Sequence, residues 1–248
     1  MRLPDITGII KRRILVNYRL EPSIVAPLLP APFRPRLHRG HAIAGICLIR
    51  LEKIRPQGLP ALIGISSENV AHRVAVEWDE GPTVRDGVFV LRRDTDSLVN
   101  HYAGGRVFPG VHQFANFAVR DAGGHVGLRA RTDTGIALVE LRGHETDAFP
   151  ADSIFSSLQE SSRFFETGCH GYSLCATGEL EGLKLITREW TVKPFAVEIC
   201  RSKFFADQRV FPEGSIFLDH ALIMRDVEHD WQQCDVPSAT VKRIQSAQ

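Results

Sequence analysis

Residues 61–78, ALIGISSENVAHRVAVEW, constrain the fold most, because they are rich in β-branched residues and alternate too regularly for a helix. They predict one long strand whose two faces both mix apolar and polar side chains. The first face carries Ser66, Glu68, Val70, His72, Val74 and Val76, and the second carries Ser67, Asn69, Ala71, Arg73, Ala75 and Glu77. Because valine favours burial, we expect Glu68 and His72 to point inward.

Similar segments recur along the chain and predict a mainly β domain that spans residues 1–248, with residues 236–248 a loose tail. The other expected strands are 12–20, 41–54, 84–93, a meander within 113–144, 171–177, 183–192, 195–205 and 215–227. Short helices are expected after Pro22 and after Asp96, the second ending at Gly104. The clearest helix is 153–167, whose stripe of Ile154, Phe155, Leu158 and Phe165 we expect to pack outside the sheet.

Composition excludes several classes of function. Thirty basic and 29 acidic residues give a net charge of +1, so no global field attracts nucleic acid or an anionic membrane. Five cysteines without a CxxC pair predict neither a disulfide framework nor a zinc site, and they fit a cytoplasmic protein. No secretory signal or long apolar stretch is present, so we expect no membrane span.

The sequence contains no motif that predicts a cofactor. The sequence lacks a serine nucleophile elbow, a dinucleotide-binding glycine motif and a phosphate-binding loop. Glu68 and His72 share a strand face but lie roughly 13 Å apart along it, too far to share one metal ion. We therefore predict neither a metal nor an organic cofactor.

The central segment 101–117, HYAGGRVFPGVHQFANF, carries the main catalytic candidate. Its glycines allow a tight turn, and His112 follows at the mouth of a strand, in phase with Phe114. An imidazole facing the interior can exchange protons near neutral pH, although a histidine that only hydrogen-bonds the turn is the alternative. Arg106 lies beside the glycines, where it could hold a substrate group.

A second cluster lies where a strand ends, at residues 92–96, RRDTD. One of its two arginines could bind a carboxylate while the other pairs with the acidic helix cap. A purely structural role for both arginines remains open.

Four segments, SENVAHRVAVEW, LRRDTDS, AGGRVFPGVHQFANF and SIFSSLQESSRFFETGCHGYS, resemble the YqjF-like family, a domain of unknown function. Members of that family look like a branch of the acetoacetate decarboxylase-like superfamily. The resemblance implies a cone-shaped antiparallel β-barrel that encloses a polar pocket, with helices outside. It also implies assembly into homo-oligomers.

In the decarboxylase, a turn containing glycine and arginine leads to a lysine pair, whose first member forms a Schiff base with the substrate ketone. The resemblance places that pair at His112 and Gln113, so the lysines are missing here. The relocated candidates for that role are Lys53, Lys184, Lys193 and Lys203, but none occurs in a motif that marks it as buried, and we expect each at the surface.

These observations favour an enzyme that acts on a keto or carboxylate metabolite, with lyase or hydratase-like proton transfer. In this hypothesis His112 and Glu68 are the acid and base, and Arg73 or Arg106 holds the substrate. Asn69, His72 and Gln113 complete the expected binding residues. The alternatives are a non-catalytic binding protein for a small metabolite, and a structural module whose interior is filled by side chains.

Overall fold

The computed structural model describes residues 5–98 and 110–237, and within them seven strands close into a ring. In order around the ring these are β1 (Ile6–Leu20), β4 (His41–Pro56), β5 (Ile65–Glu80), β6 (Thr83–Thr95), β11 (His170–Leu174), β12 (Leu180–Thr187) and β14 (Ile216–Cys234). Antiparallel pairing of β1 with both β4 and β14 closes the ring, whereas β6 and β11 pair in parallel. The expectation of a mainly β fold is confirmed.

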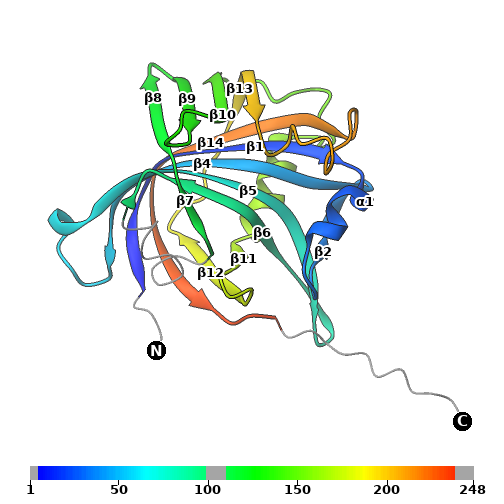
Figure 1. The fold of residues 1–248 in the computed structure, drawn as a ribbon, viewed down its shortest axis with the longest axis horizontal. Coiled ribbons are helices and arrows are strands. Elements are labelled where there is room, and N and C mark those ends of the chain that lie inside the picture. Colours follow the sequence, from blue (N-terminus) through cyan, green and yellow to red (C-terminus); the bar gives the residue numbers. More distant parts are fainter. Residues whose placement is uncertain (1–4, 99–109, 238–248) are drawn as a thin grey trace, which may run out of the picture.

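A second layer packs on the outside of the ring. It consists of β8 (Asn116–Ala122), β9 (His125–Arg131), β10 (Ala137–Glu145) and β13 (Lys193–Ser202), and it joins the ring where β13 pairs with β14. Ile46 and Val74 from the ring meet Leu128 and Leu141 from this layer in one buried core. Figure 1 shows β8, β9 and β10 above the ring strands. The predicted meander within 113–144 is therefore confirmed.

Shorter elements connect these layers. They are α1 (Pro22–Val25), the 3-10 helices η1 (Ala26–Leu28) and η2 (Ala61–Ile63), and the strands β2 (Arg34–Pro35), β3 (Leu37–His38) and β7 (His112–Phe114). The predicted strand 61–78 begins only at Ile65, because η2 occupies its first residues. The helix expected to end at Gly104 lies largely outside the described residues, and so does most of the expected tail. No helix in the described ranges is both long and apolar enough to cross a lipid bilayer.

Helix α3 (Leu158–Thr167) starts later than the predicted 153–167. Its N-cap is Ser157, whose Oγ accepts a hydrogen bond from the Glu160 backbone N–H at 3.1 Å. The prediction that this segment packs outside the ring is wrong. Phe155, Phe164 and Phe165 pack against Leu15, Ile43 and Leu222, which project from the ring toward its interior. In Figure 1 the helix is the yellow-green coil behind β4 and β5.

Candidate functional site

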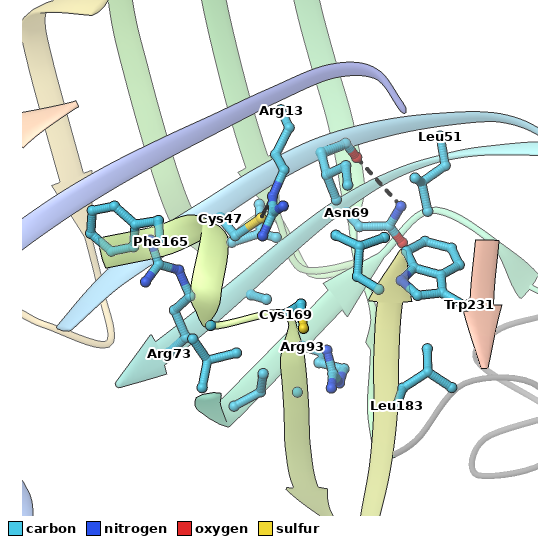
Figure 2. A pocket seen from close by; sticks show the side chains of 18 of the residues that line it. Arg13, Cys47, Leu51, Asn69, Arg73, Arg93, Phe165, Cys169, Leu183 and Trp231 are labelled. Atoms are coloured by element: carbon cyan, nitrogen blue, oxygen red, sulfur yellow. Dashed lines mark hydrogen bonds between the residues drawn. The ribbon is translucent and has the colours of Figure 1, made fainter. Parts of the chain in front are cut away.

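A cavity of about 180 Å³ lies inside the ring, and residues from all seven ring strands and from α3 line it. An engineered protein cavity of roughly 150 Å³ binds benzene, so this space suits one small metabolite. Figure 2 shows apolar side chains, Leu51, Leu183 and Trp231, on one side of the cavity. Arg73 and Phe165 lie on the opposite side. The cavity therefore combines an apolar wall with a charged one.

Three arginines face this cavity: Arg13 from β1, Arg73 from β5 and Arg93 from β6. Within the described residues, their side-chain hydrogen bonds go to neutral groups. Arg13 Nε donates to Cys47 Sγ at 3.3 Å, Arg73 Nη2 to Asn17 Oδ1 at 2.7 Å and Arg93 Nη2 to Ser173 Oγ at 3.3 Å. Each arginine keeps at least one buried nitrogen without a partner, and none forms an ion pair within the described ranges.

Electrostatics make the cavity positive. Burial lowers the pKa of Arg73 to about 10 and that of Arg93 to about 10, so both remain charged at neutral pH. Two acidic residues reach the cavity wall, but Asp94 is already held by Arg92, whose Nη2 lies 2.7 Å from Oδ1. The other, Glu166, is exposed to solvent. The charge of Glu181 raises the pKa of Arg93, against the effect of burial. Guanidinium groups that form no ion pair are able to pair with a carboxylate.

The strand register explains how Arg73 is held. Asn17 on β1, Gly45 on β4 and Arg73 on β5 are directly paired across three neighbouring strands. Gly45 has no side chain between the other two, and a Cβ there would lie 3.3 Å from Asn17 Oδ1 and 2.5 Å from the Val16 carbonyl oxygen. The missing side chain lets Arg73 reach over Gly45 to Asn17.

A buried polar network fixes Asn17 in turn. His220 Nε2 lies 3.1 Å from Asn17 Nδ2 and 2.7 Å from Ser161 Oγ, and His220 Nδ1 lies 2.6 Å from Asp219 Oδ2. Burial lowers the pKa of His220, which favours the neutral ring that accepts at Nε2. Ser161 is completely buried, so this serine, histidine and aspartate group orients Asn17 rather than contacting a ligand.

His112 lines the cavity at the start of β7, and it lies opposite Arg93 in the register of the neighbouring strand β6. Its Nδ1 lies 3.2 Å from the Gly110 carbonyl oxygen, so in the neutral ring Nδ1 carries the proton and Nε2 the lone pair. Gly110 has φ +84°, and a Cβ there would lie 2.5 Å from Ser173 Oγ, so only glycine fits this turn. The backbone thus sets the position of the imidazole.

The structure brings only some of the predicted site residues together. Asn69 and Arg73 line the cavity with His112, and Asn69 Nδ2 donates to Ser67 Oγ at 2.8 Å. Gln113 points away and is exposed, because neighbouring residues of a strand face opposite sides. Arg106 lies outside the described residues.

Glu68 and His72 do not reach the cavity, and the prediction that they contribute to it is wrong. They lie on the outer face of β5, under the second layer. Glu68 Oε2 accepts from Arg12 Nη2 at 2.6 Å, and His72 Nε2 lies 2.8 Å from Ser202 Oγ. Burial raises the pKa of Glu68, against the opposing effect of Arg12, and lowers the pKa of His72 to about 3. Both are therefore buried polar groups of the core.

Sequence reasoning overlooked Arg13 and Cys47. Arg13 lies near the beginning of the expected strand 12–20 and shares the strand phase of the buried Leu15, which is a usable signal. Cys47 is paired with Leu15 on β1, which places its thiol on the same inner face. Nothing in the local sequence marks this cysteine.

The cavity offers no described residue for a Schiff base or for a metal ion. None of its described lining residues is a lysine. Lys184 alternates with Leu183 and Leu185, which face the cavity, so its side chain projects to the other side of β12. Among residues 5–98 and 110–237, no group of three His, Cys, Asp or Glu side chains is arranged to hold a metal ion.

Comparison with known proteins gives the family. The model of DUF2071, described as "Uncharacterized conserved protein (COG2071)", matches residues 10–216. The chain belongs to this family. None of the curated proteins compared with the DUF2071 chain matches it.

Solved structures share the fold of this DUF2071 protein. Acetoacetate decarboxylase from Legionella pneumophila has 11% identity and a TM-score of 0.61, covering 94% of this chain and 88% of that one. An acetoacetate decarboxylase-like enzyme from Sphingomonas wittichii RW1 has 14% identity and a TM-score of 0.59, with coverages of 95% and 94%. The enduracididine biosynthesis enzyme MppR, complexed with pyruvate, has 14% identity and a TM-score of 0.59, with coverages of 94% and 91%. These likenesses confirm the expected fold.

Proposed function

We propose that the ring cavity binds a small carboxylate-bearing metabolite and catalyses proton transfer on it without a Schiff-base lysine. One observation supports the proposal: three guanidinium groups border a cavity of metabolite size, and none of them forms an ion pair within the described ranges. A buried cation is costly to keep unpaired, and a ligand carboxylate would relieve that cost. The structural neighbour MppR, which has been seen with pyruvate, supports a 2-oxo acid as the first ligand to test.

Each cavity residue has a separate role in this proposal. Arg13 and Arg73 bind the carboxylate, and Arg93 stabilises negative charge that develops on a carbonyl oxygen. His112 accepts a proton at Nε2 from the carbon next to the carbonyl and later returns it. Asn69 borders the same space. Glu68 takes no part, because it faces the second layer.

The second candidate is a binding protein without catalysis, and one observation favours it. Asp94 is paired with Arg92, so His112 is the one buried imidazole or unpaired carboxyl group at the cavity wall within the described ranges. A cavity with a single general acid or base of this kind can hold a metabolite without transforming it.

Proton exchange separates the two candidates. Pyruvate in D₂O should exchange its methyl protons faster with the protein than without it, as followed by NMR. Substitution His112→Gln should lower that rate by at least about 100-fold, the usual contribution of a general base, while pyruvate affinity changes less than threefold. The matched control is Gln113→Ala, the exposed neighbour, which should leave both quantities unchanged.

Three results would count against catalysis or against the site. Binding without exchange in the wild-type protein would support the binding protein instead. Failure to bind pyruvate or any longer 2-oxo acid would overturn the proposal. A borohydride-trapped adduct on a lysine would contradict its lysine-free chemistry.

A further inference from the structure

Cys47 occupies an unusual position among the arginines of the cavity. Its side chain is 7% exposed and lines the cavity from β4, and its Sγ accepts a hydrogen bond from Arg13 Nε at 3.3 Å. Figure 2 shows the sulfur against the Arg13 guanidinium. Arg73 is only 2% exposed and lines the same cavity, with Nε and Nη1 unpartnered. A ligand that satisfies these nitrogens must therefore come close to the thiol.

The charges on Arg73 and Arg93 are also coupled to Cys47. Burial lowers the pKa of both arginines, and Cys47 is close enough to each of them for charge on its sulfur to oppose that effect. The thiolate is the nucleophilic form of a cysteine. Cys47 therefore lies within the field of three guanidinium groups.

The other cysteines lack this environment. Burial raises the pKa of Cys169, which lines the same cavity, and also raises that of Cys200 and Cys234. Cys200 accepts a hydrogen bond from the Tyr18 hydroxyl at 3.1 Å, and Cys175 contacts Thr177 Oγ1 near the surface. Within residues 5–98 and 110–237, Cys47 is the one cysteine of the five that hydrogen-bonds a guanidinium.

We propose that Cys47 is a nucleophilic thiol that adds reversibly to the electrophilic carbon of a small carboxylate, above all to the carbonyl carbon of a 2-oxo acid. The proposal rests on the proposed carboxylate site. The sulfur forms a bond to the carbonyl carbon while the C=O π bond breaks, and its electron pair moves to the oxygen. The proton of the thiol ends on that oxygen, so the adduct is a hemithioketal and no other reagent is needed.

The geometry selects the class of ligand. A carboxylate bound to the arginines lies next to the sulfur, so an electrophilic carbon bonded directly to that carboxylate comes within reach. In a longer keto acid, whose carbonyl is separated from the carboxylate, the reactive carbon would be carried away from Cys47. The site thus favours 2-oxo acids over 3-oxo acids for this step.

Alkylation with two matched reagents tests whether the arginines direct an anionic reagent to the Cys47 thiol. Iodoacetate and iodoacetamide both transfer their CH₂ group to sulfur with loss of iodide, and the thiol proton goes to the buffer. Peptide mapping by mass spectrometry should show Cys47 reacting at least about tenfold faster with iodoacetate, whereas Cys175 shows no such preference. Substitution Arg73→Gln should abolish the preference at Cys47. The matched control is Arg209→Gln, an exposed arginine outside the cavity, which should preserve it.

Equal rates with the two reagents, or no labelling of Cys47 in the folded protein, would overturn the proposal. The covalent step is tested by NMR with pyruvate labelled with ¹³C at its carbonyl carbon. At saturation a signal of a tetrahedral carbon should appear in the wild-type protein and be absent in Cys47→Ser, which should still bind pyruvate. Binding without that signal in the wild-type protein would refute the adduct alone. Loss of pyruvate binding in the wild-type protein would refute the carboxylate site itself.

Discussion

Replacing Arg73 by methionine should remove carboxylate binding while changing the stability of the fold very little. Burial lowers the pKa of this arginine from its usual range to about 10, so its proton affinity falls more than a hundredfold. Since a tenfold change corresponds to about 1.4 kcal/mol, keeping the charge buried costs on the order of 3 kcal/mol. Methionine removes that cost and fills a similar volume.

The substitution also loses two favourable contacts. The hydrogen bond from Arg73 Nη2 to Asn17 Oδ1 is a charged one, worth roughly 1.5–3 kcal/mol. The guanidinium lies 4.9 Å from the centroid of the Phe165 ring, which adds about 0.5–2 kcal/mol. Gains and losses nearly cancel, so the free energy of unfolding should stay within about 2 kcal/mol of the wild-type value.

Urea denaturation at pH 7, followed by circular dichroism, measures this change. The matched control is Arg225→Met, because Arg225 pairs with Asp121 at 2.8 Å and with Glu145 at 2.6 Å. That control should lower the free energy of unfolding by roughly 1–3 kcal/mol and leave pyruvate affinity unchanged. A loss above about 4 kcal/mol in Arg73→Met would mean that the fold itself needs the buried charge, and the reasoning would fail.

Two further predictions concern the core. Substitution Phe165→Ala should lower the free energy of unfolding, measured by urea denaturation, by about 3–5 kcal/mol. It should also weaken pyruvate binding, because Phe165 lines the cavity beneath Arg73. Unchanged affinity in the folded variant would contradict this placement. Burial lowers the pKa of His72 to about 3 and that of His229 to about 4, so below pH 6.5 the unfolded chain binds protons that the folded chain does not. Each of these two histidines should therefore lower the free energy of unfolding by about 1.4 kcal/mol per pH unit between pH 6 and pH 4.5, and His72→Gln should reduce the slope by about that amount. A flat profile in this window would count against two buried neutral histidines.

The alternation in residues 61–78 predicted correctly which side chains share a face of β5. Asn69 and Arg73 indeed lie together, and so do Glu68 and His72. The pattern gave no way to choose the face that meets the cavity, because β5 is covered on both sides, by the second layer and by the ring interior. If one face of the strand were exposed to solvent, its side chains would be mostly polar, and the sequence would show which face is buried.

Helix α3 illustrates a similar limit. Its phenylalanines predict that one side is buried, but not whether the surface that buries it lies inside or outside a ring. The polar contacts at the cavity join segments that are distant in the sequence. Arg13 contacts Cys47, and Arg73 contacts Asn17, only because of the register of β1, β4 and β5. Arg92 and Arg93 were the exception. Their position beside Asp94 suggested that one arginine pairs with the acid while the other is available, and Arg92 does form that pair.

The central claim is that the arginines of the cavity recognise the charge of a carboxylate, and isothermal titration calorimetry tests it most directly. Pyruvate and its uncharged amide have nearly the same shape and differ in charge. Pyruvate should bind at one site per chain, at least about tenfold more tightly than the amide, and Arg73→Met should remove that difference. Equal affinity for the two ligands in the wild-type protein, or an unchanged preference for pyruvate in Arg73→Met, would contradict the claim.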